Sequence, residues 1–295
     1  MKIQLRWQVA GVMVLSIGLM VWPGAAMAAD NDLDGIADDL ETGTPVSPLM
    51  FGGVTYQPCA AGALTTFQRN ACLSLTTQDI FVYLVTAAGG GFLAQNGLID
   101  MSKTPVDVSV LFQFITSPHT ATTRGKVDGL GVGVHVAVVN TVPVSRAVGA
   151  LGQQAVVMTV DESASAFAFG STDEGTPSNT GNSTFWPVYI KNYLNSRIMG
   201  GVDTPSVWKP YIQRTASHEL GHAAALTAAF DTSLGQYHYA SGSGTVMDDS
   251  VVCNSNKHTC AIYNDYASPD SLCLRGLVIP FTNPLQCTAL PVPIL

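Results

Sequence analysis

The sequence predicts an α+β fold, and three observations lead to this expectation. Apolar, strand-like runs recur between residues 80 and 160, and clusters of Gly and Pro separate them. Two segments with helical character, 186–198 and 210–230, follow these runs instead of alternating with them. Only 12% of the 295 residues are charged, which is typical of a compact folded domain and not of a disordered or coiled-coil chain.

The first 28 residues have the pattern of a secretory signal peptide. Lys2 and Arg6 form a basic start, Val9 to Trp22 is almost entirely apolar, and Ala26-Met27-Ala28 is the small-x-small pattern that signal peptidase cleaves. An uncleaved membrane anchor is the alternative, but the apolar run is short for a helix that spans a bilayer. We therefore expect export to the periplasm or the outside of the cell, with no membrane association after cleavage.

Cleavage would remove two of the 13 basic residues and none of the 21 acidic ones, which leaves a net charge of about −10. An acidic surface of this kind argues against nucleic acid or an anionic membrane as a partner and suits a protein that binds cations. The sequence does not indicate an oligomeric state.

Residues 30–41 fit the twelve-position calcium loop. The pattern places carboxylates at positions one, three and five, a glycine (Gly35) at the turn, a backbone carbonyl at position seven, and carboxylates at positions nine and twelve. The predicted calcium ligands are Asp30, Asp32, Asp34, Ile36, Asp38 and Glu41. The loop resembles those of thrombospondin type 3 and dockerin modules rather than a paired EF-hand, because no entering helix precedes it. A structural calcium ion would clamp the new N-terminus.

The remainder of the N-terminal segment, 29–77, is rich in Pro, Gly, Thr and Ala after Glu41, and we expect irregular chain held by a disulfide. Six cysteines in an exported protein predict three disulfides. A cysteine-rich zinc site is the alternative, but the sequence contains no C-x-x-C pair. Pairing between sequence neighbours is our expectation: Cys59 with Cys72, Cys253 with Cys260, and Cys273 with Cys287.

The elements after residue 78 follow from apolar pattern and breakers. The expected strands are Ile80–Val85, Val106–Ile115, Val132–Val139 and Ala155–Val160. We expect Ser171–Ser183 to be a polar loop, Pro187 to open one helix, and Pro210 to open a second that continues to Phe230. The chain beyond Gly242 is loop-rich and carries four of the six cysteines.

The second helix contains the segment His218-Glu219-Leu220-Gly221-His222. Residues four apart lie one turn above each other, so both imidazoles project to one side of the helix and can bind one Zn²⁺. Glu219 flanks the same face, where its carboxylate can take a proton from a zinc-bound water as that water attacks a carbonyl. A structural pair of histidines on an Ala-rich helix is the alternative.

A catalytic zinc needs a third protein ligand and an open fourth position. No Glu follows Glu219, so a ligand of that type from a downstream helix is excluded. His238 is the leading candidate, and Asp248 and Asp249 are the reserve candidates. The other histidines, His119, His135 and His258, are not expected to bind the metal.

The stretch from His218 to Asp248 resembles the metzincin class of zincin peptidases, in which H-E-x-x-H is followed by a third histidine and a Met-containing turn. Thr245-Val246-Met247-Asp248 is similar to that turn, which implies that Met247 lies beneath the metal. Metzincins have Gly three residues and His six residues after the second histidine, where this chain has Ala225 and Ala228. The third ligand would therefore come from a loop beyond the helix.

The resemblance implies a zincin-like domain over 78–295, with a twisted mixed sheet, a backing helix and an active-site helix. A loop-rich, disulfide-bonded subdomain would occupy about 250–295. It also implies hydrolysis of a peptide bond in a protein or peptide substrate, with Glu219 as general base. Tyr237 and Tyr239 flank His238, and either hydroxyl is a candidate to stabilise the oxyanion.

A second function class competes with the peptidase. The chain could be a secreted, calcium-stabilised binding or adhesion protein with a structural or vestigial zinc site. The presence of Glu219 argues against this alternative, because a purely structural site has no use for a base.

Overall fold

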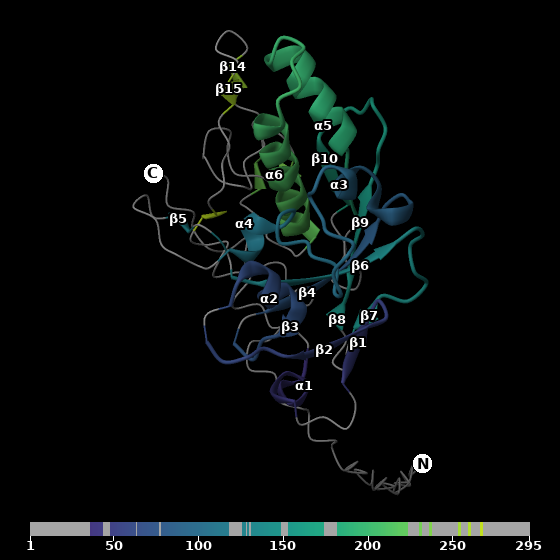
Figure 1. Ribbon diagram of the computed structural model, residues 1–295, viewed down its shortest axis with the longest axis vertical. Helices are drawn as coiled ribbons and strands as arrows, with labels where there is room; N and C mark the ends of the chain where they lie inside the picture. Colours follow the sequence, from purple (N-terminus) through teal and green to yellow (C-terminus); the bar gives the residue numbers. More distant parts are fainter. Residues whose placement is uncertain are drawn as a thin grey trace, which may run out of the picture.

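The computed structural model describes residues 36–43, 48–62, 64–76, 78–117, 126–127, 129, 131–148, 153–173 and 182–223, together with five two-residue strands between 230 and 267. Its centre is a five-stranded sheet with helices on one face and a small N-terminal layer on the other (Figure 1). The predicted α+β class is confirmed.

The central sheet has the order β10-β11-β9-β4-β6. Its strands are β4 (Asp79–Val85), β6 (Gly133–Val139), β9 (Val156–Val160), β10 (Gly170–Asp173) and β11 (Asn182–Phe185). The strands β11, β9, β4 and β6 are parallel, and β10 is antiparallel to β11 at one edge. The sheet is therefore mixed, with one short antiparallel strand at its edge.

Alternation along β4 explains why both faces of the sheet are covered. Val82 and Leu84 belong to the larger apolar cluster on the helical face, whereas Phe81 belongs to a smaller cluster on the opposite face. Strand β6 divides in the same way, with Val134 and Val136 on the helical face and Ala137 on the other. A central strand buried on both faces is apolar along most of its length, which is why the sequence predicts β4, β6 and β9 well.

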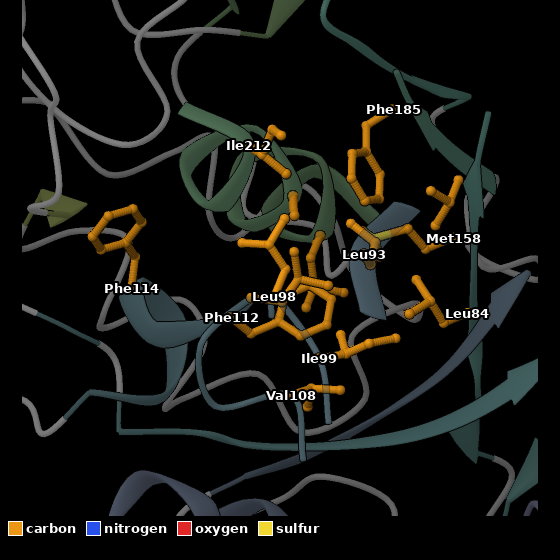
Figure 2. Packing of buried hydrophobic residues seen from close by; sticks show 14 of the residues in the cluster. Leu84, Leu93, Leu98, Ile99, Val108, Phe112, Phe114, Met158, Phe185 and Ile212 are labelled. Carbon is orange, nitrogen blue, oxygen red and sulfur yellow. The ribbon is translucent and has the colours of Figure 1, made fainter. Parts of the chain in front are cut away.

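The helical face is covered by α3 (Gly91–Gln95), α4 (Gln113–Thr116), α5 (Pro187–Tyr193) with its π-helical extension η2 (Leu194–Ile198), and α6 (Pro205–Ala223). Figure 2 shows part of the cluster between these helices and the sheet, where the side chains of Leu93, Met158 and Phe185 lie together. Ile212 contributes to the same cluster from α6, and it is fully buried. Among the described helices, none combines the length and the apolar composition needed to cross a membrane.

The opposite face carries α1 (Asp38–Thr42), β1 (Leu49–Phe51), β2 (Val54–Pro58), α2 (Thr66–Ala71) and β3 (Cys72–Leu73), which lie away from α5 and α6 in Figure 1. Strands β1, β2 and β3 form their own three-stranded sheet. Phe51 packs on the central sheet, with ring centroids 5.0 Å from Phe81 and 4.7 Å from Tyr83. The predicted disulfide between Cys59 and Cys72 is present, and it joins the end of β2 to the start of β3.

A buried His–Asp pair joins this N-terminal layer to the central sheet. His135 on β6 and Asp79 on β4 are fully buried, with Nε2 2.9 Å from Oδ1. Nδ1 of His135 lies 3.0 Å from the backbone oxygen of Asn70 in α2, so Nδ1 must carry a proton. The rings of Tyr56 and Phe81 each lie 4.7 Å from the imidazole. Protein groups therefore surround the imidazole of His135, and neither side chain is exposed to solvent.

The remaining elements are short. They are η1 (Ala88–Gly90), β5 (Lys126–Val127), β7 (Ala147–Val148), β8 (Gln153–Gln154), β12 (Phe230–Asp231), β13 (Gln236–Tyr237), β14 (Cys253–Asn254), β15 (Thr259–Cys260) and β16 (Tyr266–Ala267). In the antiparallel pair β14–β15, Cys253 and Cys260 are directly opposite each other. This register suits the predicted disulfide between them, and the pair Cys273–Cys287 lies outside the described residues.

Three sequence-based expectations are wrong. The segment 106–115 forms an isolated bridge at Asp107, turns and the start of α4 instead of a strand. The segment after Glu41 is not irregular, because it contains β1, β2, α2 and β3. The expected polar loop at 171–183 begins in β10 and ends in β11.

The two helix predictions are better. Pro187 does open α5, as expected. The second helix begins at Pro205, five residues before the expected start, and Pro210 lies within its second turn. Its predicted continuation beyond Ala223 lies outside the described residues.

Candidate functional site

The candidate site lies on the C-terminal half of α6, which is buried on all sides. Every residue from Tyr211 to Ala223 is buried, and the helix packs against β10, β11, α4 and α5. A buried helix is expected to be apolar all round. This one carries polar side chains in its buried part: Gln213, Arg214, Thr215, Ser217, His218, Glu219 and His222. Burying so many polar groups is costly unless they are paired or serve a function, so the local sequence itself points to a site.

The N-terminal end of α6 is fixed by the loop before it. The indole N–H of Trp208 donates to Oδ1 of Asp203 at 2.8 Å, and the side-chain amide of Asn195 donates to the same oxygen at 2.9 Å. The ammonium of Lys191 lies 3.2 Å from Oδ2 of Asp203 and 5.0 Å from the centre of the Trp208 ring. These contacts tie α6 to α5 and set the direction in which the helix enters the core.

His218 and His222 project their imidazoles toward the same point. Their Nε2 atoms are 3.1 Å apart, and the ring centroids are 4.6 Å apart with the rings nearly perpendicular. Their exposed fractions are 7% and 8%. Two nitrogens that bind one tetrahedral zinc ion at about 2.0–2.1 Å each lie about 3.3 Å apart. The donor type and the separation therefore fit a shared zinc ion. The single helical turn between the two residues sets the separation.

Glu219 faces the sheet edge from the same turn of the helix. It is 5% exposed, and the hydroxyl of Thr172 on β10 donates to its Oε2 at 2.6 Å. Burial raises the pKa of Glu219 to about 7, although the Thr172 hydrogen bond and the charge of Arg214 both act to lower it. A carboxyl group with a pKa near neutrality can both accept and return a proton at physiological pH.

The approach of β10 to Glu219 requires a glycine. A Cβ atom added at Gly170 would lie 2.2 Å from Oε1 of Glu219, far inside contact distance. Residues 170 and 172 alternate with 171, so they share one face of β10. One oxygen of the carboxylate is therefore adjacent to Gly170 and the other is hydrogen-bonded to Thr172.

Gly170 and Thr172 are not recognisable as site residues from the sequence. Strand β10 consists of Gly-Ser-Thr-Asp, and nothing in this composition distinguishes it from a loop. The neighbouring strand β11 (Asn-Ser-Thr-Phe) has one apolar residue, Phe185, and its fully buried Ser183 carries no apolar signal in the sequence.

Most of the other predicted site residues cannot be placed. His238, Tyr239, Met247, Asp248 and Asp249 lie outside the described residues. Tyr237 is in β13, opposite Phe230 of β12. Within the described part of the chain, His, Cys, Asp and Glu side chains do not form a metal-ligand group of three or more. The described donors to a zinc ion are therefore the two imidazoles of α6, and a third ligand remains a prediction.

The predicted calcium loop is described only in its second half. Asp30, Asp32 and Asp34 lie outside the described residues. Ile36 is fully buried, Glu41 is 3% exposed, and Asp38 begins helix α1, which ends at Thr42 and is capped by Gly43 in the left-handed conformation. The last part of the pattern thus runs into a short helix whose Glu41 points into the protein.

Comparisons with known proteins assign no family. No protein-family model matches the chain, and no curated protein matches it. Among solved structures, one match is to a chain of the "GM1 bound form of the ECX AB5 holotoxin", with 13% sequence identity and a TM-score of 0.26. The match covers 60% of this chain and 60% of that chain, which is less than two thirds of either. A TM-score this low does not establish a shared fold, so no conclusion about fold or function follows from it.

Proposed function

We propose that this protein is a zinc-dependent peptidase. The observation that carries the proposal is the pair of imidazole nitrogens of His218 and His222, 3.1 Å apart on one buried helix, with the Glu219 carboxylate on the same turn. Imidazole is a usual ligand of zinc in proteins, and a catalytic site combines such ligands with a nearby base.

When bound, zinc would supply Lewis-acid chemistry, in which it polarises a peptide carbonyl and increases the acidity of water. His218 and His222 would hold the ion with His238 as the proposed third ligand, and Asp248 or Asp249 is the alternative third ligand. Glu219 would accept a proton at a carboxylate oxygen from the attacking water and donate it to the leaving amine. Tyr237 or Tyr239 would donate a hydrogen bond to the developing oxyanion, and Met247 would lie under the site, as the resemblance implies.

The edge strand β10 supports a peptide as substrate. In the five-stranded sheet β10 has β11 as its neighbour on one side, and none of the described strands pairs with its other edge. An extended peptide can add to such an edge through backbone hydrogen bonds. Because β10 contacts Glu219 through Gly170 and Thr172, a peptide on this edge would run close to the base.

The architecture supports a zincin-like arrangement. A mixed sheet with an antiparallel edge strand lies beside the helix that carries the two histidines, and a second helix, α5, packs on the same face. The resemblance in the segment from His218 to Asp248 selects peptides among acyl substrates, so this step rests on analogy.

We also propose a structural calcium ion at residues 30–41 and export of the protein. The calcium proposal is supported by the burial of Glu41 at the last position of the loop pattern. The export proposal is supported by the signal-peptide pattern and by the Cys59–Cys72 disulfide, since disulfides persist in oxidising compartments.

The direct test is hydrolysis of an unselective peptide library by the purified mature chain, together with its zinc content. We expect one zinc per chain, turnover that a zinc chelator abolishes, and Glu219→Gln with retained zinc and a loss of kcat of at least about 10³-fold. Zinc-loaded wild type that cleaves no peptide would contradict the proposal and favour the binding or adhesion alternative.

A further inference from the structure

The carboxylate of Glu219 is hydrogen-bonded to the edge strand of the sheet. The hydroxyl of Thr172 donates to Oε2 at 2.6 Å and also lies 3.2 Å from the backbone oxygen of Glu219. The hydroxyl of Ser183, on the adjacent strand β11, donates to that same backbone oxygen at 3.1 Å and lies 2.9 Å from Oγ1 of Thr172. Ser183 is fully buried, so water does not compete for its hydroxyl.

Counting protons gives this small network a direction. In the ionised form that a general base requires, the carboxylate accepts hydrogen bonds but cannot donate them, so the single Thr172 proton is directed to Glu219. The contact between the two hydroxyls must then use the Ser183 proton. This proton has two acceptors within reach, Oγ1 of Thr172 and the backbone oxygen of Glu219. Ser183 therefore orients Thr172, and Thr172 orients the carboxylate. A length of 2.6 Å is in the range of a charge-assisted O–H···O⁻ bond.

Gly170 leaves room for the carboxylate on the other side. Its backbone leaves no room for a side chain, because an added Cβ would lie 2.2 Å from Oε1. Oε1 occupies the space that a side chain at residue 170 would take, and Oε2 accepts the Thr172 hydrogen bond. Rotation of the carboxylate away from the strand would break this hydrogen bond.

We propose that Thr172 is a positioning residue for the general base Glu219, with Ser183 as its support. This inference rests on the proposed function, because it assigns Thr172 a role in catalysis only if Glu219 acts as the base. A base that must meet a water molecule within hydrogen-bonding distance loses rate when it samples other orientations. The role requires a hydroxyl at residue 172 and not merely a side chain of that size.

The test compares Thr172→Val, Thr172→Ser and Ser183→Ala in the full mature chain loaded with zinc. Valine keeps the shape of threonine but removes the donor, so we expect kcat to fall about 10- to 100-fold with KM and zinc content unchanged. Thr172→Ser should restore most of the lost kcat, and Ser183→Ala should cause a smaller loss than Thr172→Val. Thr184→Val is the matched control, because Thr184 is on β11 next to Ser183 but faces the other side of the sheet.

The outcomes separate this inference from the proposed function. If wild type hydrolyses peptides and Glu219→Gln does not, but Thr172→Val matches wild type in kcat, the positioning role is wrong and the peptidase proposal stands. Loss of zinc or a large drop in thermal stability in Thr172→Val would show that the hydroxyl holds the helix, which also overturns the positioning role. If zinc-loaded wild type is inactive, the peptidase proposal and this inference both fail.

Discussion

Single residues on α6 show how a short sequence rule produces a site. His218 and His222 need only an intact helical turn between them to bring their Nε2 atoms to 3.1 Å, so their arrangement could be predicted from spacing alone. Thr172 is 47 positions away from Glu219 in the sequence, and its contact depends on the packing of an edge strand against the helix. No local pattern contains that information, so the histidines and the glutamate can be predicted from the sequence but the residues that hold the glutamate cannot.

The proposed metal ligands lead to a first prediction. His222→Ala should reduce zinc content from one per chain to nearly none and lower kcat/KM by at least about 10³-fold, because one of two preorganised nitrogens is removed. Zinc content by mass spectrometry under native conditions and peptide hydrolysis measure these effects. His119→Ala is the control, since His119 is not expected to bind the metal. Full zinc content in His222→Ala would rule out the proposed ligand set.

A second prediction concerns Gly170. Gly170→Ala places a Cβ 2.2 Å from Oε1 of Glu219, so the carboxylate must move or the strand must shift. We expect zinc to be retained and kcat to fall about 10- to 100-fold, because displacement of the base by about 1 Å has an effect of that size. Steady-state kinetics on the zinc-loaded variant test this prediction, and an unchanged kcat would mean that the position of Glu219 in the structure is not the catalytic one.

At the scale of secondary-structure elements, burial explains which predictions succeed. Strands β4, β6 and β9 are covered on both faces, and their continuous apolar sequences are recognisable. Strand β10 is at an edge and is made of small polar residues, so its sequence does not differ from that of a loop.

The segment 106–115 is the opposite case, because a strand is predicted there and the structure has none. Val108, Leu111 and Phe112 are fully buried there, but they belong to turns and the start of a short helix. A short apolar run indicates burial and does not by itself distinguish strand from turn or helix.

The His135–Asp79 pair joins three elements and gives a third prediction. Removing one partner leaves a buried polar group unsatisfied, so Asp79→Ala should lower the free energy of unfolding by about 3–5 kcal/mol. Unfolding in urea, followed by fluorescence, measures the change. Asp100→Ala is the control, because Asp100 is exposed, and its effect should be much smaller. A loss below about 1 kcal/mol in Asp79→Ala would show that the pair does not hold α2 on the sheet.

At the scale of the whole molecule, two apolar clusters lie on opposite faces of one sheet, and the N-terminal layer completes the smaller cluster. Ile36, within the predicted calcium loop, and Leu49, which follows it, are buried in that cluster, so the second half of the loop is part of the folded core. Composition predicted irregular chain here, because it cannot reveal that short strands gain their stability from packing on the central sheet. The proposed calcium ion would therefore act on the stability of the whole fold.

A fourth prediction follows from this connection. Calcium at about 100 times its dissociation constant should stabilise the native protein by about 2.7 kcal/mol, and Glu41→Gln should lose most of that stabilisation. Thermal unfolding with calcium and with a calcium chelator gives the comparison. Asp39→Asn is the matched control, because Asp39 is exposed in the same helix and is not at a predicted ligand position. An identical response to calcium in wild type and Glu41→Gln would exclude the loop as the binding site.

The central claim is that His218 and His222 share one zinc ion. X-ray absorption at the zinc edge on the purified mature protein tests it most directly. We expect one zinc per chain with a first shell of imidazole nitrogens at about 2.0–2.1 Å, and almost no zinc absorption from His222→Ala. A protein that purifies without zinc and does not take it up, or a shell without imidazole, would contradict the account.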